Sequence, residues 1–240
     1  MSKRWLIQIS AIVPAGFLIF LKLDPVINES TLRSTFSDTW FCSIYGHDLY
    51  PALPPSVSPQ KNWINDPNGL VYFEGEYHLF YQYNPFGDRW GHMTWGHAVS
   101  TDLLHWTELP PAIPEEDGIM IFSGCVVIDS LNTAGFGSKA MVAIYTGHEE
   151  GKRQTQHIAY STDRGRTWTK YAQNPVLNYE PEQRDFRDPN VFWYEPLGVW
   201  LMTVVLPHEQ KALFYHSKNL IEWQLMGDFQ VRDASVGIWE

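Results

Sequence analysis

The phrase Ser161-Thr162-Asp163-Arg164-Gly165-Arg166-Thr167-Trp168 has two counterparts in the chain. They are Ser100-Thr101-Asp102-Leu103-Leu104-His105-Trp106 and, less well preserved, Ser217-Lys218-Asn219-Leu220-Ile221-Glu222-Trp223. Each reads as the end of a strand, a polar turn and a tryptophan that opens the next strand. Trp168 follows Trp106 by 62 residues and precedes Trp223 by 55. A repeat of this length, with about four short strands per unit, indicates a β-propeller, in which we expect the tryptophans to pack between adjacent blades.

Strand-like runs connect these phrases, and no convincing amphipathic helix lies among them. The runs are rich in β-branched and aromatic residues and are often separated by Gly, Pro, Asn or Asp. They comprise residues 70–73, 77–83, 93–100, 122–128, 140–145, 157–161, 191–194, 200–205 and 212–216. The predicted fold class is therefore all-β.

A second recurring motif carries acidic residues. In Trp63-Ile64-Asn65-Asp66-Pro67-Asn68-Gly69-Leu70, Asp66 lies between an amide and a proline, and Asn68-Gly69 is a turn signal. The carboxylate of Asp66 is therefore predicted to be held at the rigid mouth of a strand that begins near Leu70. An ordinary surface turn is the alternative, because Asp-Pro-Asn-Gly is common turn chemistry.

The repeat distributes this motif over several blades. Asp66-Pro67-Asn68 returns 122 residues later, about two periods, as Asp188-Pro189-Asn190. Phe122-Ser123-Gly124 occupies the corresponding place between them, and Glu240 follows Asp188 by 52 residues. The first strand of every blade lines the central channel of a propeller. We therefore predict that Asp66, Ser123, Asp188 and Glu240 face one another at one mouth of that channel.

Carboxylates that meet in an aromatic pocket suit glycoside hydrolysis. That reaction needs one ionised carboxylate as nucleophile or base and one carboxylic acid with a raised pKa, on either side of the sugar. Clustered acids can instead bind Ca²⁺. Here the acids belong to different blades and lack the alternate-position spacing of a metal loop, so the metal site ranks lower and no cofactor is expected.

Composition narrows the classes of protein further. The 240 residues are 44% hydrophobic and 15% aromatic, which fits a β-protein core or a sugar-binding surface. The formal net charge is −10 and no basic run is present, so nucleic acid is not an expected partner. The two cysteines, Cys42 and Cys125, form no disulfide framework. They pair if the chain is secreted, or remain two buried free thiols.

The N-terminus differs from the rest. Lys3 and Arg4 precede an apolar run over residues 5–23, so residues 1–23 are predicted to be a secretory signal peptide or an uncleaved membrane anchor. The protein is therefore predicted to be secreted or extracellular, with attachment to the membrane as the alternative. Residues 24–59 read as a linker that ends in a proline-rich segment, and the folded domain is expected to span residues 60–240.

Five motifs follow in order: the 63–70 motif, His78-Leu79-Phe80-Tyr81-Gln82-Tyr83-Asn84-Pro85, Trp95-Gly96-His97-Ala98, Phe122-Ser123-Gly124 and Phe186-Arg187-Asp188-Pro189. In this order and spacing they resemble the invertase, inulinase and levanase family of β-fructofuranosidases, glycoside hydrolase family 32. The resemblance covers about three-quarters of the chain. It implies a five-bladed β-propeller, incomplete here, and a C-terminal β-sandwich that the 240 residues do not include.

The resemblance also assigns roles. It makes Asp66 the nucleophile that forms a fructosyl-enzyme intermediate, and Asp188 the transition-state stabiliser, held by Arg187. Glu240 is the acid/base candidate, because Gly237-Ile238-Trp239-Glu240 arrives at the distance at which the family has the glutamate of its Glu-Cys-Pro motif. The predicted substrate-binding set is Asn65, Pro67, Asn68, Gln82, Trp90, Phe122, Ser123 and Arg187.

The expected function is retaining hydrolysis of terminal β-fructofuranosyl residues from sucrose or from fructans such as inulin and levan. The 240 residues alone are expected to be unstable or inactive, since five repeats of about 60 residues need more chain and unpaired strand edges remain. The alternatives are a non-catalytic glycan-binding propeller, another propeller glycosidase and a fructosyltransferase. Substrate preference, and hydrolysis versus transfer, stay open.

Overall fold

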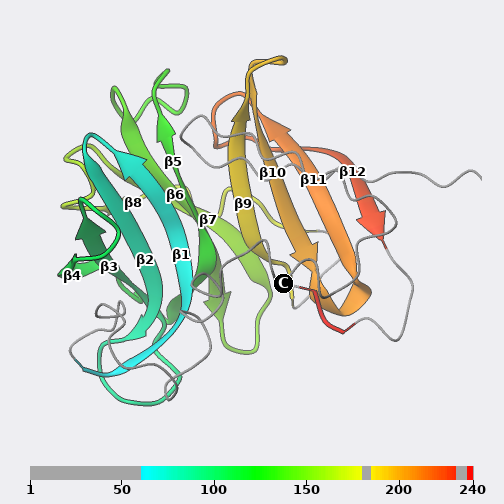
Figure 1. The fold of residues 1–240 in the computed structure, drawn as a ribbon. Helices are drawn as coiled ribbons and strands as arrows, with labels where there is room; N and C mark the ends of the chain where they lie inside the picture. The colour runs from blue at the N-terminus through cyan, green and yellow to red at the C-terminus, as the bar shows by residue number, and fades with distance from the viewer. Residues whose placement is uncertain (1–60, 180–184, 231–236, 240) are drawn as a thin grey trace, which may run out of the picture. The chain divides into compact units, whose positions relative to one another are not determined.

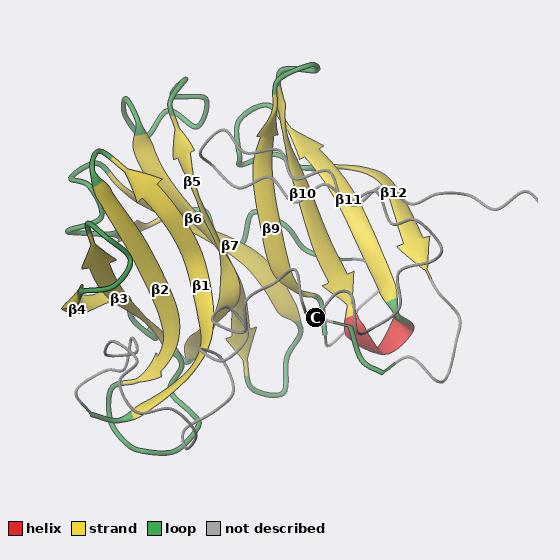
Figure 2. Cartoon of the chain, viewed as in Figure 1, coloured by secondary structure: helices red, strands yellow, loops and turns green. Residues whose placement is uncertain are grey.

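The computed structural model describes residues 61–179, 185–230 and 237–239. Three four-stranded antiparallel sheets occupy this part of the chain, each built from consecutive strands (Figures 1 and 2). The strands are β1 (Trp63–Phe73), β2 (Glu76–Asn84), β3 (Thr94–Ser100), β4 (Trp106–Ile113), β5 (Ile119–Asp129), β6 (Ala140–Glu149), β7 (Gln154–Ser161), β8 (Thr169–Lys170), β9 (Arg187–Tyr194), β10 (Val199–Leu206), β11 (Lys211–Ser217) and β12 (Gln224–Gln230). A single 3₁₀ turn, η1 (Pro207–Glu209), lies between β10 and β11 in these residues.

The three sheets are blades of a β-propeller: blade 1 is β1–β4, blade 2 is β5–β8 and blade 3 is β9–β12. The first strands of neighbouring blades contact each other, β1 with β5 and β5 with β9. The first strand is therefore the innermost strand of each blade, as the repeat predicted. The fold class is confirmed, and the predicted five blades remain a prediction.

The repeated phrase is a fixed turn between the third and fourth strands of a blade. In all three copies the serine hydroxyl lies within hydrogen-bond distance of the Asp or Asn side chain two residues later, at 3.1, 2.7 and 3.1 Å. The tryptophan indole N–H donates to the carbonyl oxygen three residues before it, at 3.0, 3.1 and 3.0 Å. Local polar contacts therefore shape the turn, which explains why the phrase recurs.

The repeated tryptophans differ in their packing. The ring of Trp168, in blade 2, lies edge-on to Phe80 of blade 1, with centroids 5.4 Å apart. Trp223 packs against the core between blades 2 and 3, so both residues confirm the predicted place between blades. Trp106 packs against Tyr81 and Tyr83 of its own blade.

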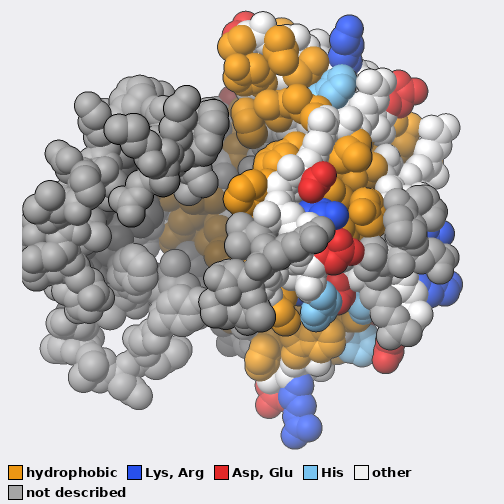
Figure 3. Space-filling view, turned by 90° about the vertical axis from the view of Figure 1, so that its right-hand side faces the viewer, with side chains coloured by type: hydrophobic (Ala, Val, Ile, Leu, Met, Phe, Trp, Pro, Cys, Tyr) orange, Lys and Arg blue, Asp and Glu red, His pale blue; other side chains and the backbone are white. Residues whose placement is uncertain are grey.

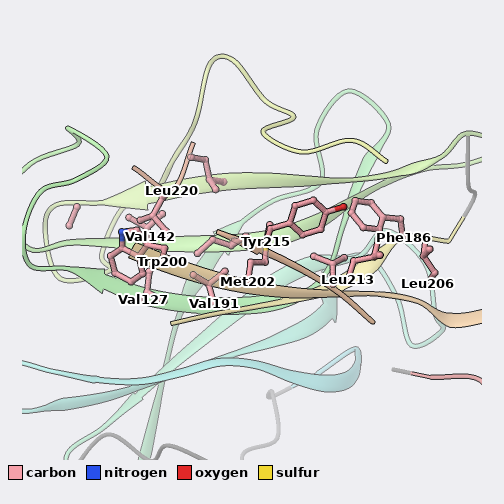
Figure 4. Packing of buried hydrophobic residues seen from close by; sticks show 14 residues of the cluster. Val127, Val142, Phe186, Val191, Trp200, Met202, Leu206, Leu213, Tyr215 and Leu220 are labelled. Atoms are coloured by element: carbon pink, nitrogen blue, oxygen red, sulfur yellow. The ribbon is translucent and has the colours of Figure 1, made fainter. Parts of the chain in front are cut away.

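The core between blades 2 and 3 is a continuous apolar layer (Figure 4). Val127 and Val142 from blade 2 meet Val191, Trp200 and Met202 from blade 3, all at most 9% exposed. These side chains come from alternate strand positions, which point to one face of a sheet. Burial of a large apolar side chain contributes about 1.5–3 kcal/mol, so this layer stabilises the packing of blade 3 against blade 2.

The predicted start of the first strand was wrong. Strand β1 runs through the whole acidic motif, from Trp63 to Phe73, instead of beginning near Leu70. The pairing with β2 is irregular between Ile64 and Pro67 and again between Asn68 and Val71, where Gly69 adopts φ +53°. A Cβ on Gly69 would also lie 2.7 Å from Val126 Cγ2 of blade 2. The turn chemistry therefore produces a bulge within a continuing strand, because β2 pairs with β1 on both sides of it.

Several predicted features lie outside the described residues: the leader or anchor over residues 1–23, the linker over residues 24–59, Cys42 and Glu240. Across residues 61–179, 185–230 and 237–239, no helix has the length and apolar character needed to cross a membrane. Cys125 is a free thiol, and burial raises its pKa to about 12. Its Sγ accepts a hydrogen bond from the Val191 N–H across the blade 2–blade 3 boundary, at 3.1 Å.

Candidate active site

A pocket of about 480 Å³ lies where the inner strands of the three blades meet. Its lining comes from all three blades: Asn65, Asp66, Gln82, Trp90, Met93, Phe122, Ser123, Arg187 and Asp188. Eight of the eleven predicted site residues are among them. The topology therefore brings together side chains that are distant in the sequence, in the way the repeat predicted for Asp66, Ser123 and Asp188.

Asp66 enters the pocket from the bulged part of β1 and is exposed to solvent. The Ser123 hydroxyl, on the first strand of blade 2, lies 3.5 Å from Asp66 Oδ2 as a hydrogen-bond donor. Beside Asp66, the indole N–H of Trp63 donates to Asn65 Oδ1 at 2.8 Å, so the Asn65 amide has a fixed orientation. The site thus presents an accessible carboxylate between a hydroxyl and an oriented amide.

Pro67 and Asn68 do not line the pocket. Asn68 is 4% exposed and braces the motif from within: its Oδ1 accepts the Gly124 N–H at 3.2 Å, and its Nδ2 donates to the Asp66 carbonyl at 3.3 Å. The Asn68 side chain thus points towards blade 2 instead of the pocket. Its contacts position Asp66, whereas the sequence predicted a substrate contact.

Asp188, the second residue of β9, has a left-handed backbone conformation. Its φ is +61°, in the left-handed region that costs a non-glycine residue about 1–3 kcal/mol. Its N–H donates to Thr146 Oγ1 of blade 2 at 3.1 Å. Backbone strain of this kind clusters at functional sites, where surrounding contacts hold it in place.

Arg187 links the acids of this segment. Its guanidinium lies 3.2 Å from Asp185 Oδ1 and 3.5 Å from Asp188 Oδ2. Asp185 Oδ2 also lies 2.7 Å from His208 Nε2. Arg187 therefore contacts Asp185 as well as Asp188, the acid that the resemblance assigns it to hold.

Aromatic side chains form one wall of the pocket. Trp90 is 55% exposed and meets the Phe122 ring edge-on, with centroids 6.1 Å apart. The ring of His148 stacks on the Phe122 ring, with centroids 4.4 Å apart. Burial lowers the pKa of His148. Such faces can stack against the C–H surface of a sugar.

Gln82 brings a buried side-chain amide to the wall of the pocket. It is 2% exposed, and its Nε2 has no hydrogen-bond partner within the described part of the chain. Buried amides are nearly always hydrogen-bonded, so a donor of this kind in a pocket wall fits a ligand hydroxyl.

Met93 lines this site without having been predicted there, whereas His148, a histidine expected to be structural or to lie at the rim, supports the pocket wall through Phe122. Met93 is 1% exposed and lines the pocket just before β3, and His148 reaches Phe122 only because β5 and β6 pair. A motif search could not find either residue, because neither belongs to a motif that carries chemistry.

A second, larger cavity of about 770 Å³ lies along β6 and β7. Its lining includes Gly147, Glu149, Thr155 and His157, which alternate along these strands with residues that contact blade 3. Among the described residues that line it, the one carboxylate is Glu149, which is paired with Lys152. The smaller pocket holds both predicted catalytic acids of the described residues, so it is the better candidate. In that part of the chain, no group of three His, Cys, Asp or Glu side chains is arranged to hold a metal ion.

Residues 57–240 match the N-terminal domain of glycosyl hydrolases family 32. The chain belongs to this family. A levanase of Bacillus subtilis (strain 168) is 52% identical over 203 residues, which cover 82% of this chain and 29% of the levanase. An invertase of Debaryomyces hansenii is 41% identical over 90% of this chain and 40% of the invertase. The family 32 chain therefore spans well under half the length of these relatives.

Solved structures of the family agree with the fold. The exo-inulinase of Aspergillus awamori has a TM-score of 0.72 and 43% identity, over 76% of this chain and 40% of the exo-inulinase. A fructofuranosidase of Schwanniomyces occidentalis in complex with fructose has a TM-score of 0.68 and 45% identity, over 72% of this chain and 35% of that protein.

For this family 32 chain, the described residues stop just before the acid/base candidate Glu240. The preceding residue, Trp239, stacks on Phe229 of β12 with centroids 6.0 Å apart. Its N–H donates to the Pro207 carbonyl at 3.5 Å, at the end of β10 that pairs with Arg187. Trp239, which precedes Glu240 in the sequence, therefore lies at the end of blade 3 where β10 pairs with Arg187.

Proposed function

We propose that this chain forms the N-terminal, catalytic part of a retaining glycoside hydrolase that removes terminal β-fructofuranosyl residues from sucrose or fructans. The observation that carries the proposal is the pocket itself, where two carboxylates from blades 1 and 3 meet a hydroxyl and an aromatic wall. The relatives named levanase, exo-inulinase and invertase support the substrate class.

In this proposal Asp66 is the nucleophile. Its carboxylate attacks the anomeric carbon of the fructosyl unit while Glu240, as general acid, protonates the departing oxygen. The resulting ester is then hydrolysed by a water molecule that Glu240, now a base, deprotonates. The exposed position of Asp66 keeps its carboxylate accessible to the sugar, and the Ser123 hydroxyl orients it.

The other acid has a different role in the proposal. Asp188 accepts hydrogen bonds from fructose hydroxyls and stabilises the positive charge that develops on the ring. Arg187 stabilises the ionised form of Asp188 and limits its movement. Asn65 and Gln82 hydrogen-bond further hydroxyls, and the aromatic wall packs against the ring.

We also propose that the protein is secreted. The related exo-inulinases of Aspergillus awamori and Aspergillus niger are named extracellular. Substrates of polymeric size would require such a location. Residues 1–23 would then direct export, as a cleaved signal or a retained anchor.

The test is hydrolysis of sucrose, inulin and levan by the protein expressed from its natural gene. We expect Asp66→Asn and Glu240→Gln to lower kcat by about 1,000-fold or more, the scale on which removal of a catalytic group acts. Asp102→Asn is the matched control, because Asp102 is an exposed turn residue outside the pocket, and should leave kcat unchanged. Hydrolysis that survives Asp66→Asn, or sugar binding without turnover in the wild type, would overturn the proposal.

A further inference from the structure

The segment 186–188 of blade 3 is held by buried polar side chains of blade 2. The Asp188 N–H donates to Thr146 Oγ1 at 3.1 Å, and the Thr146 hydroxyl in turn donates to Gln156 Oε1 at 2.9 Å. Gln156 Nε2 donates to the Phe186 carbonyl at 2.7 Å. Two side chains of one blade thus fix the backbone on both sides of Arg187 in the next.

The same pattern continues two residues further along the β6–β7 hairpin, at the next pair on the same face. Gln154 Oε1 accepts the Phe186 N–H at 3.0 Å, and Gln154 Nε2 lies 3.4 Å from His148 Nδ1. Thr146 pairs with Gln156 across the hairpin, and His148 pairs with Gln154. His148 stacks on Phe122 in the pocket wall, so the hairpin contacts both the acidic segment and the aromatic wall.

These contacts are interior ones. Thr146 and Gln156 are both 0% exposed and Gln154 is 2% exposed. A buried hydroxyl or amide that loses its partner is unfavourable, so each group is held to its partner with little freedom. A residue with φ +61° needs such external constraints, because its backbone would otherwise relax.

We propose that Thr146 and Gln156 are positioning residues that fix the direction of the Asp188 carboxylate towards the pocket. The proposal rests on the function proposed above, in which Asp188 stabilises the transition state. Blade 2 also supplies Ser123, which contacts Asp66. Blade 2 therefore contacts both acids: Ser123 of β5 reaches Asp66 of blade 1, and the β6–β7 hairpin holds Asp188 of blade 3.

The test compares Thr146→Val, which removes the hydroxyl at nearly constant volume, with Thr146→Ser, which keeps it. Thr146→Val should lower kcat on sucrose by about 10- to 100-fold with KM changed less than about threefold, since misplacement of a transition-state contact by about 1 Å has this scale. Thr146→Ser should restore kcat to within about threefold. Gln156→Met, a second variant, should lower kcat like Thr146→Val.

Thr133→Val is the matched control. Thr133 Oγ1 also joins blades 2 and 3, accepting the indole N–H of Trp200 at 2.9 Å, but it lies beyond the other end of β5. This variant should lower Tm and leave kcat unchanged. In an Asp188→Asn background, Thr146→Val should add no further loss, because the two residues act as a unit. A full kcat in Thr146→Val, an equal loss in Thr133→Val or an additive loss in the double variant would overturn the proposal.

A readout without substrate separates this proposal from the proposed function. Hydrogen exchange of the Asp188 amide should be slow in the wild type and at least about tenfold faster in Thr146→Val, because the acceptor is gone. Unchanged exchange would overturn the positioning role. Absence of fructoside hydrolysis in the wild type would instead count against the proposed function, and the exchange measurement would still decide whether Thr146 holds Asp188.

Discussion

At the scale of single residues, Asp188 shows that the site is built at a cost to local stability. Its left-handed backbone is unfavourable for any side chain with a Cβ. In this conformation the Asp188 side chain lines the pocket while its N–H donates to Thr146. Strain of this kind is retained where function needs it.

Two variants isolate that strain. Asp188→Ala and Asp188→Gly both lack the carboxylate and should both be inactive, but glycine adopts φ +61° without penalty. We expect the free energy of unfolding of Asp188→Gly to be about 1 kcal/mol higher than that of Asp188→Ala. Urea unfolding of the two proteins measures the difference, and equal stabilities would show that the backbone at position 188 is relaxed.

The sequence predicted individual residues where they belong to motifs. Asp66, Asp188 and Ser123 were located by their spacing relative to the tryptophan repeat, because equivalent positions in different blades converge. Thr146 and Gln156 could not be found in this way. Their role depends on the register of one hairpin and on which face of blade 2 meets blade 3. Neither property can be read from the identity of a single residue in the sequence.

At the scale of elements, the reliable signals were those with local physical causes. The Ser-Asp-Trp phrase marks a turn because its hydrogen bonds are internal to the phrase. Two strands show no clear strand pattern in the sequence. Strand β8 has only two residues. Strand β4 contains two prolines, which are tolerated because β4 lies at the edge of its sheet. The sequence indicated a turn at Asn68-Gly69 where the structure has a bulge. A turn and a bulge can both place a glycine at positive φ, as Gly69 is here.

The pairing of β2 with β3 contains a buried histidine pair. His78 Nδ1 and His97 Nε2 lie 3.1 Å apart, and both residues are at most 1% exposed. Burial lowers the pKa of His78 to about 4 and that of His97 to about 3, from 6.5. Glu76 opposes the shift at His78, whereas Arg164 and Arg166, which pair with Glu76, add to it.

This pair predicts a loss of stability in acid. Below about pH 6.5 the unfolded chain binds protons at both histidines, whereas the folded state does not until about pH 4. The free energy of unfolding should therefore fall as the pH falls through this range, by up to about 1.4 kcal/mol per pH unit for each histidine. Urea unfolding at several pH values between about 4 and 6.5 measures how steeply the free energy of unfolding changes with pH. A His78→Leu/His97→Phe variant should have a shallower slope, and an unchanged slope would show that the pair does not cause it.

At the scale of the whole molecule, the outer face of blade 3 is apolar. Phe192, Tyr194 and Phe214 are between 38 and 39% exposed and alternate with residues that pack on blade 2. Seen from the side of β12, hydrophobic side chains gather in several patches between charged ones (Figure 3). A face of this kind normally packs against another element.

We therefore expect the 240-residue chain, expressed by itself, to self-associate and to lack activity. The chain spans 29–40% of the length of the levanase and invertase relatives, and the apolar face of blade 3 would be covered in a longer propeller. Sedimentation velocity and a sucrose assay on the same sample measure both properties. A monomer that hydrolyses sucrose, and loses this activity in Asp66→Asn, would show that three blades suffice.

The central claim is that side chains from different blades act on one fructosyl ring through a covalent bond to Asp66. Rapid quenching of the Glu240→Gln protein with a fructoside that has a good leaving group, followed by peptide mapping by mass spectrometry, tests it most directly. We predict one fructosyl residue esterified to the peptide that contains Asp66. A fructosyl ester on another residue, or turnover with inverted configuration and no ester, would contradict the account.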